Sequence, residues 1–198
     1  MNVRLTEAEK VKILNSEDVY TIMQQVLLRE NKISRSQEHF WVMGLDVNNK
    51  ILFLELISLG SLTKTIVEPP EVFRMAIYKL AINIILIHNH PSGALQPSDA
   101  DLDVTDRLYQ VGKILRIEVL DHLIINEEHY LSFLNEDILE KLAQSTKYQP
   151  PQSLIARIKE EATKLNQLET AKRMKNKGLA PSLIAEMTGL SEEEVAGL

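Results

Sequence analysis

The sequence lacks several features, and each absence excludes a class of protein. It contains no cysteine, so disulfide bonds, thiolate nucleophiles and cysteine-ligated zinc sites are excluded, and any metal ion must be held by histidine and carboxylate groups. No apolar run approaches the roughly 18 residues that a membrane-spanning helix needs, so we expect no membrane association. The first 20 residues carry charges throughout and have no apolar stretch of the secretory type, so the expected location is the cytoplasm.

The sequence has fewer basic residues than acidic ones, 22 against 28. The formal net charge is -6, which argues against broad electrostatic binding of nucleic acid. Residues 153–178 are the exception, because there seven Lys and Arg residues stand against three acidic ones. Residues 179–198 reverse this balance, with four acidic residues and no basic one. We therefore expect the C-terminal part to carry one short basic stretch followed by an acidic end.

The chain does contain enough apolar material, 44% of 198 residues, for one full domain and a small appendage. Apolar residues recur at helical spacing over residues 16–30, which predicts an amphipathic helix. Two segments rich in aromatic and β-branched residues, 37–47 and 50–60, flank Asn48-Asn49 and predict a hairpin. Because both strands are apolar on both faces, we expect helices to cover each side of the sheet.

Helices and strands then alternate along the chain. A helical stripe after Pro69-Pro70 leads into the apolar strand NIILIHNH, and a helix from about Ser98 to Leu115 precedes a strand over 117–126. The alternation predicts an α/β fold, with a three-layer α/β/α mixed sheet within residues 1–148. The segment QPPQS breaks the pattern, so we predict a linker at 149–153 and a helical, helix-turn-helix-like tail at 154–198.

Two histidines lie one residue apart at the end of the apolar strand. Side chains two apart in a strand point to the same face, so His88 and His90 can converge on one ion. The next helix begins near Ser98 and places Asp101 in its first turn. A catalytic zinc ion takes three protein ligands and leaves one position open, and these three side chains would supply that set.

Each half of this pattern also has a purely structural interpretation. A strand histidine is commonly a hydrogen-bonded core residue, and Ser98 and Asp101 have the spacing of a helix capping box. Two histidines on one face, however, would repel each other if charged and would be costly to bury neutral without partners, which favours the metal site. For His122, which shares a strand face with Leu120 and Ile124, we predict a core role or support of a ligand rather than direct ligation.

The segment His88-Asn89-His90-Pro91-Ser92-Gly93, followed by Pro97-Ser98 and Asp101, resembles the JAMM (MPN+) metalloprotease motif in the form found in the bacterial RadC family. The similarity extends over about residues 16–135 and includes EHFWV at 38–42, Glu71-Val72-Phe73, Thr105 and DHLII at 121–125. The resemblance implies a Zn²⁺ ion held by His88, His90 and Asp101. It also implies that the JAMM glutamate is Glu38 and the JAMM serine is Ser98.

The implied activity is that of a zinc-dependent hydrolase, a metallopeptidase or isopeptidase acting on a peptide or protein. Glu38 would act as the general base and Ser98 would donate a hydrogen bond to the developing oxyanion. From the residues alone, Glu55 on the partner strand competes with Glu38 for the first role. The segment Ala94-Leu95-Gln96 and Pro70 depart from the family pattern, and both departures concern substrate preference.

Two alternatives remain open. The first is a DNA-associated accessory protein of repair or mobile elements, suggested by the historical association of RadC with repair and by the basic stretch of the tail. Against it, the last predicted helix offers acidic side chains, which phosphate repels, at positions Glu192, Glu193 and Glu194. The second is a binding module whose zinc ion is structural and has four protein ligands. The oligomeric state is not predicted by the sequence.

Overall fold

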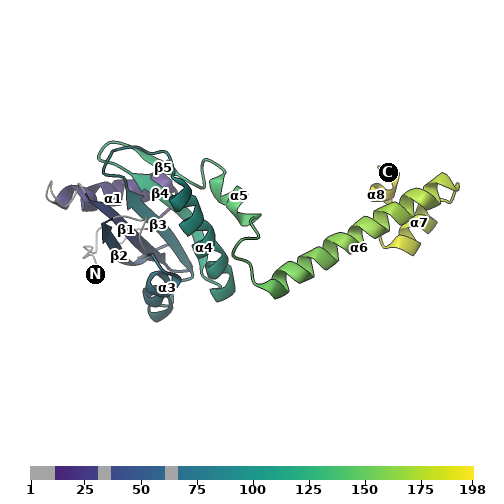
Figure 1. The fold of residues 1–198 in the computed structure, drawn as a ribbon, viewed down its shortest axis with the longest axis horizontal. Helices are drawn as coiled ribbons and strands as arrows, with labels where there is room; N and C mark the ends of the chain where they lie inside the picture. The colour runs from purple at the N-terminus through teal and green to yellow at the C-terminus, as the bar shows by residue number, and fades with distance from the viewer. Residues whose placement is uncertain (1–11, 31–36, 61–66) are drawn as a thin grey trace. The chain divides into compact units, whose positions relative to one another are not determined.

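Residues 12–30, 37–60 and 67–198 are described by the computed structural model, shown in Figure 1. The chain divides into two compact units, Met1–Tyr148 and Gln149–Leu198. Among the described residues, no helix combines the length and apolar character needed to cross a bilayer.

The first unit is built around a five-stranded sheet with the order β2-β1-β3-β4-β5. Strands β1 (Glu38–Leu45) and β2 (Ile51–Gly60) form the antiparallel hairpin, and Asn49 in their connection has a φ of 59°, as the Asn-Asn pair predicts. Strand β3 (Asn83–Asn89) runs antiparallel to β1 and parallel to β4 (Glu118–Ile125). Strand β5 (Tyr130–Ser132) completes the edge. The sheet is therefore mixed, as expected.

Helices cover both faces of this sheet (Figure 1). Helix α1 (Ser16–Arg29) packs on one face, together with Ile85 and Ile87 of β3. Helices α3 (Pro69–Tyr78) and α4 (Asp99–Leu115) pack on the other, together with Ile84 and Leu86. The three-layer α/β/α prediction is confirmed, and its reason is the apolar character of both faces of the central strands.

Strand alternation decides on which face the site lies. Ile84, Leu86 and His88 follow one another at a spacing of two, so His88 faces the layer that contains α4. A short helix, α5 (Ile138–Ala143), closes the first unit by packing Leu139 against Ile124 and Phe133.

The C-terminal unit consists of three helices, α6 (Pro151–Asn176), α7 (Pro181–Thr188) and α8 (Glu192–Ala196). The segment predicted as a linker is partly helical, since α6 begins at Pro151. The breaks between helices follow glycines with positive φ, Gly178 (78°) and Gly189 (72°). The unit has a small core of its own, formed by Ala171, Ile184, Leu190 and Val195.

Candidate metal centre

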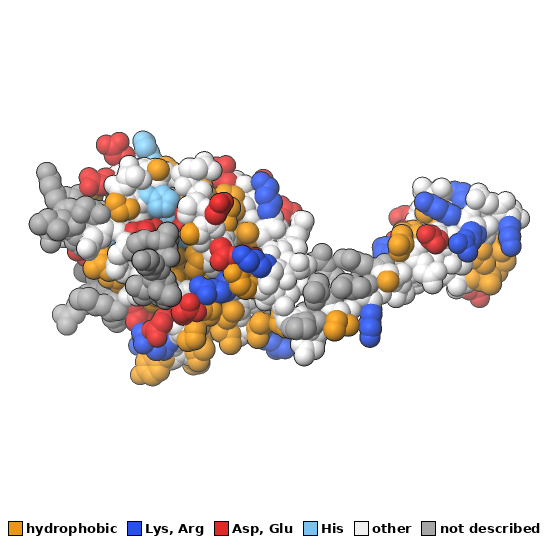
Figure 2. Space-filling model, in the orientation of Figure 1, with side chains coloured by type: hydrophobic (Ala, Val, Ile, Leu, Met, Phe, Trp, Pro, Cys, Tyr) orange, Lys and Arg blue, Asp and Glu red, His pale blue; other side chains and the backbone are white. Residues whose placement is uncertain are grey.

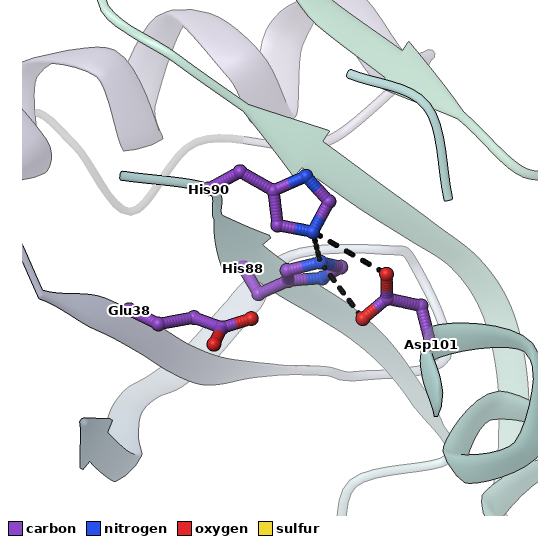
Figure 3. Close-up of side chains that lie close together, drawn as sticks. All are labelled: Glu38, His88, His90 and Asp101. Atoms are coloured by element: carbon purple, nitrogen blue, oxygen red, sulfur yellow. Dashed lines mark hydrogen bonds and ion pairs between the residues drawn. The ribbon is translucent and has the colours of Figure 1, made fainter. Parts of the chain in front are cut away.

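Four side chains converge where β3 ends, α4 begins and β1 starts (Figure 3). Glu38, His88, His90 and Asp101 each contribute one potential ligand atom, and these atoms all lie within 4.8 Å of one another. The Nε2 atoms of His88 and His90 are 3.0 Å apart. Asp101 approaches both rings, with Oδ1 3.2 Å from His88 Nε2 and Oδ2 3.3 Å from His90 Nε2. The structure thus brings together the three predicted ligands and the predicted base.

Strand register explains how Glu38 reaches the cluster from a position 50 residues away from His88 in sequence. Phe40 on β1 pairs with His88 on β3 in the antiparallel register. Two residues earlier on β1 and two residues later on β3, the same register brings Glu38 level with His90. The rival carboxylate, Glu55, lies elsewhere, because its Oε1 accepts a hydrogen bond from Arg74 of α3 at 3.2 Å.

Asp101 serves the fold and the cluster at the same time. The capping box at the start of α4 is present, since Ser98 Oγ accepts from the Asp101 amide and Asp101 Oδ2 accepts from the Ser98 amide at 2.7 Å. The Ser98 hydroxyl also donates to Oδ2, at 2.6 Å. The other oxygen, Oδ1, is directed toward His88. The structural and the metal interpretations of this residue are therefore compatible, because a carboxylate has two oxygens.

The charge state of the cluster favours a cation. Burial raises the pKa of the Asp101 carboxyl, but its contacts with His88, His90 and Ser98 outweigh that effect and hold the pKa well below its usual range. Asp101 is therefore an anion almost fully removed from solvent. The hydrogen bond with Asp101 in turn raises the pKa of His90, against the opposing effect of burial. An anion in this position needs a compensating positive charge close by.

The donor set fits a divalent metal ion. Asp101 Oδ1 is buried and accepts no hydrogen bond from any described residue. His90 Nδ1 lies 2.7 Å from the carbonyl oxygen of Ala94, which can only accept, so Nδ1 carries a proton, and in the neutral ring Nε2 presents a lone pair. Imidazole nitrogens and a carboxylate oxygen are the ligands that zinc takes in cysteine-free sites. A cation among these atoms would satisfy Oδ1 and the lone pair together.

The three predicted ligands differ in their exposure to solvent. The side chains of His88 and Asp101 are 0% and 1% exposed, whereas that of His90 is 14% exposed. Figure 2 shows histidine side chains at the surface of the first unit with acidic side chains nearby. Of the three predicted ligands, His90 is therefore the one that solvent reaches.

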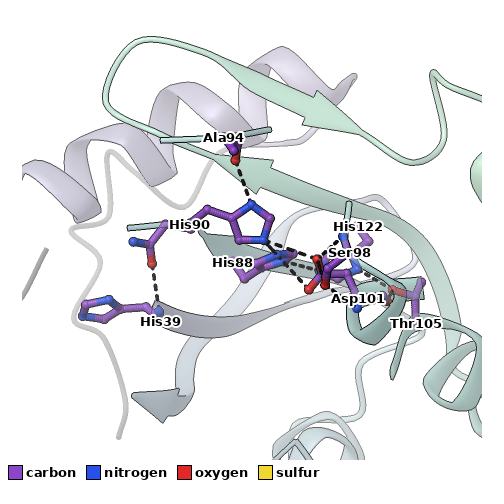
Figure 4. A network of polar contacts seen from close by, with 9 residues as sticks. His39, His88, His90, Ala94, Ser98, Asp101, Thr105 and His122 are labelled. Atoms are coloured by element: carbon purple, nitrogen blue, oxygen red, sulfur yellow. Dashed lines mark hydrogen bonds and ion pairs between the residues drawn. The ribbon is translucent and has the colours of Figure 1, made fainter. Parts of the chain in front are cut away.

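Other histidines have distinct surroundings. His122 is fully buried behind His88, with Nε2 2.8 Å from His88 Nδ1, and burial lowers its pKa well below the usual value (Figure 4). It is therefore neutral and supports a predicted ligand instead of joining the four-residue cluster. His39 stacks on Trp41, with ring centroids 4.9 Å apart, and is not part of the cluster.

The sequence analysis missed the contribution of Asn89. Its side chain points away from the two histidines and bridges to β1, where Oδ1 accepts from the His39 amide at 2.8 Å and Nδ2 donates to the Gln37 carbonyl at 3.1 Å. These two backbone groups flank Glu38. The available signal was an amide side chain, able both to donate and to accept, at the middle of the His-x-His motif.

Comparison with known proteins gives a consistent result. The family model described as "RadC-like JAB domain" matches residues 13–138. A UPF0758 protein of Caldanaerobacter subterraneus is 47% identical over 127 residues, which are 64% of this chain and 52% of that protein. A UPF0758 protein of Methanosarcina barkeri is 42% identical over 130 residues, 66% of this chain and 55% of the relative. The chain spans about half the length of the curated relatives it matches.

Proposed function

This chain belongs to the family of RadC-like JAB domains, and from that premise we propose that it is a zinc-dependent hydrolase of the JAMM type, a metallopeptidase or isopeptidase. The observation that carries the proposal is the convergence of Glu38, His88, His90 and Asp101 around a buried carboxylate oxygen without a hydrogen-bond donor. The chemistry supplied by a bound zinc ion is Lewis acidity, which polarises a carbonyl group and lowers the pKa of water.

The ligand roles follow from burial and orientation. His88 Nε2, His90 Nε2 and Asp101 Oδ1 point into one small volume and are held there by β3 and the first turn of α4. Hydrogen bonds to the far side of each group, such as the one from His90 Nδ1 to Ala94, keep the rings from rotating. These three residues would hold the ion.

Glu38 is assigned the proton transfer. It is half-buried, comes from a different strand than His88, and offers a carboxylate oxygen within 4.8 Å of the ligand atoms, so it would be within reach of a water molecule that enters the cluster. In this role it removes a proton from the attacking water and delivers it to the leaving amine. Hydrolysis of an amide bond needs this transfer because an amine leaves only when it is protonated, and the resemblance to the JAMM motif is the reason for proposing a peptide or protein substrate.

Ser98 is assigned the stabilisation of the developing oxyanion. Ser98 is an exposed residue next to the cluster, and its hydroxyl proton is directed to Asp101 Oδ2. A rotation about the Cα–Cβ bond would redirect this proton toward a substrate oxygen, while the Ser98 amide continues to hold Asp101.

The basic stretch of α6 supports DNA binding less well. Of its cations, Lys175 donates to the carbonyls of Val195 and Ala196 at the end of α8, and Arg173 lies 3.9 Å from Glu169. The lysine is thus engaged in holding the small C-terminal unit together.

A pair of variants tests the proposal. Zinc content and affinity are measured for the wild type, Glu38→Gln and His88→Ala, together with hydrolysis of a peptide library. We expect His88→Ala to lose both zinc and hydrolysis. Glu38→Gln should retain zinc within roughly threefold and lose about 10²–10⁴-fold in rate, the usual contribution of a general base. Loss of zinc from Glu38→Gln would instead identify a fourth ligand and a structural ion, and full hydrolysis in His88→Ala would refute the proposal.

A further inference from the structure

We propose that Thr105 and His122 are positioning residues that fix which ring nitrogen of His88 is available to the metal. The inference rests on the proposed metal site and adds to it a hydrogen-bond chain that runs from helix α4 through strand β4 to strand β3 (Figure 4).

The hydrogen-bond chain begins at the backbone carbonyl of Asp101, which can only accept a hydrogen bond. Thr105 Oγ1 lies 2.5 Å from the backbone carbonyl oxygen of Asp101. A carbonyl oxygen can only accept, so the hydroxyl proton of Thr105 is directed to it. The oxygen of the hydroxyl is then left with its lone pairs for any other neighbour.

That neighbour is His122. Its Nδ1 lies 2.6 Å from Thr105 Oγ1, and because the hydroxyl proton is already committed, Nδ1 must be the donor. A neutral imidazole carries one ring proton, so the other nitrogen of His122, Nε2, is an acceptor. Thr105 thereby selects one of the two tautomers of His122.

The selection is passed on to His88. The acceptor Nε2 of His122 lies 2.8 Å from His88 Nδ1, which must therefore carry the proton of that ring. His88 Nε2 is left with a lone pair directed at Asp101 Oδ1 and His90 Nε2. A histidine nitrogen must be unprotonated to coordinate a metal, because the metal binds its lone pair.

Because these three residues are buried, each hydrogen bond of the chain needs its protein partner. Thr105, His122 and His88 are all 0% exposed, so solvent cannot replace a missing partner. The chain also closes on itself, because Asp101 supplies the carbonyl that starts it and the carboxylate that meets its far end. Two ligands from different elements are thus fixed by one set of hydrogen bonds.

Removal of the hydroxyl tests the inference. Thr105→Val has nearly the shape of threonine but no acceptor for His122 Nδ1. We expect His122 to adopt the other tautomer, which places a proton on His122 Nε2, makes His88 Nδ1 the acceptor and leaves His88 Nε2 protonated. Thr105→Ser retains the hydroxyl and is the matched control.

Two readouts are needed, and neither depends on hydrolysis. Zinc affinity, from competition with a chelator, should fall about 10–100-fold in Thr105→Val and stay within roughly threefold of wild type in Thr105→Ser. Nitrogen-15 NMR of the histidine rings in metal-free protein should show His88 protonated on Nδ1 in the wild type and Thr105→Ser, and on Nε2 in Thr105→Val. A merely structural role of Thr105 would not change the ring tautomer.

The inference is overturned if Thr105→Val binds zinc like the wild type, or if His88 keeps its proton on Nδ1 in that variant. If Thr105→Val does not fold, a second pair carries the same comparison. His122→Gln can still accept from His88 Nδ1 and should retain zinc binding, whereas His122→Leu should lose it; equal affinities would overturn the inference. Absence of zinc binding in the wild type would refute the proposed function, while the tautomer measurement on metal-free protein would still decide this inference.

Discussion

Replacement of Asn89 should separate catalysis from metal binding. The Asn89 side chain holds the Gln37 carbonyl and the His39 amide, the two backbone groups on either side of Glu38. Asn89→Ala removes both hydrogen bonds and frees the start of β1, while His88, His90 and Asp101 stay on β3 and α4. We therefore expect Glu38 to be displaced and the ion-holding groups to remain in place.

The size of the effect follows from these two bonds. The His39 amide bonds within a buried stretch, and leaving a buried donor without its acceptor costs about 1–3 kcal/mol. The bond to the Gln37 carbonyl adds roughly 0.5–1.5 kcal/mol. The free energy of unfolding should thus fall by about 1.5–4.5 kcal/mol, and a misplacement of Glu38 by about 1 Å should slow hydrolysis by roughly 10²-fold.

The assay compares Asn89→Ala with Asn89→Asp. The aspartate keeps an acceptor for the His39 amide but places a carboxylate oxygen against the Gln37 carbonyl, so only one of the two bonds is lost. Amide hydrogen exchange at His39 should accelerate in Asn89→Ala and stay slow in Asn89→Asp, and zinc affinity should change less than roughly threefold in both, since no ligand is altered. Unchanged exchange at His39 and an unchanged hydrolysis rate in Asn89→Ala would refute the reasoning.

Three further outcomes are expected. Zinc at about 100 times its Kd should raise the free energy of unfolding by about 2.7 kcal/mol, and thermal unfolding should show no such gain in a His88→Ala/His90→Ala variant. Burial raises the pKa of Asp121 against four hydrogen bonds, so its stabilising contribution is present at low pH and is lost as pH rises through the raised pKa. In the presence of a chelator, the stability of the wild type relative to Asp121→Asn should therefore fall as the pH rises above 3.8, the ordinary pKa of aspartate, and a constant difference would contradict this assignment. Gly44→Ala places a Cβ 1.9 Å from the ring of Phe53, so urea unfolding should show a loss of about 1–3 kcal/mol, where an ordinary strand glycine would gain from the change.

The layers of the fold follow from periodicity. Strand β3 is apolar at successive positions, so both faces of the sheet need a covering layer. The structure has α1 on one face and α3 and α4 on the other. Elements too short to show a period were not predicted, namely β5 with three residues and α5 with six. Their positions depend on contacts such as Leu139 against Phe133, which no local pattern encodes.

The candidate site also has a part that the sequence predicts and a part that depends on the tertiary structure. His88 and His90 share a face because of strand geometry, and that much is visible in the sequence. The choice of Glu38 over Glu55 required the register between β1 and β3, and without the family resemblance the residues left it open. The hydrogen-bond chain through Thr105 and His122 joins three elements, and only their packing brings those polar atoms within bonding distance.

The clustered residues differ in how much each contributes to the stability of the fold. Asp101 caps a helix, and His88 satisfies the buried ring of His122, so a substitution at either disturbs folding as well as chemistry. Glu38 lies at the first position of its strand, is half-buried and comes from a different strand than the two histidines. Under the proposed roles, a single substitution at Glu38 would remove the proton-transfer group while the three residues proposed to hold the ion stay in place.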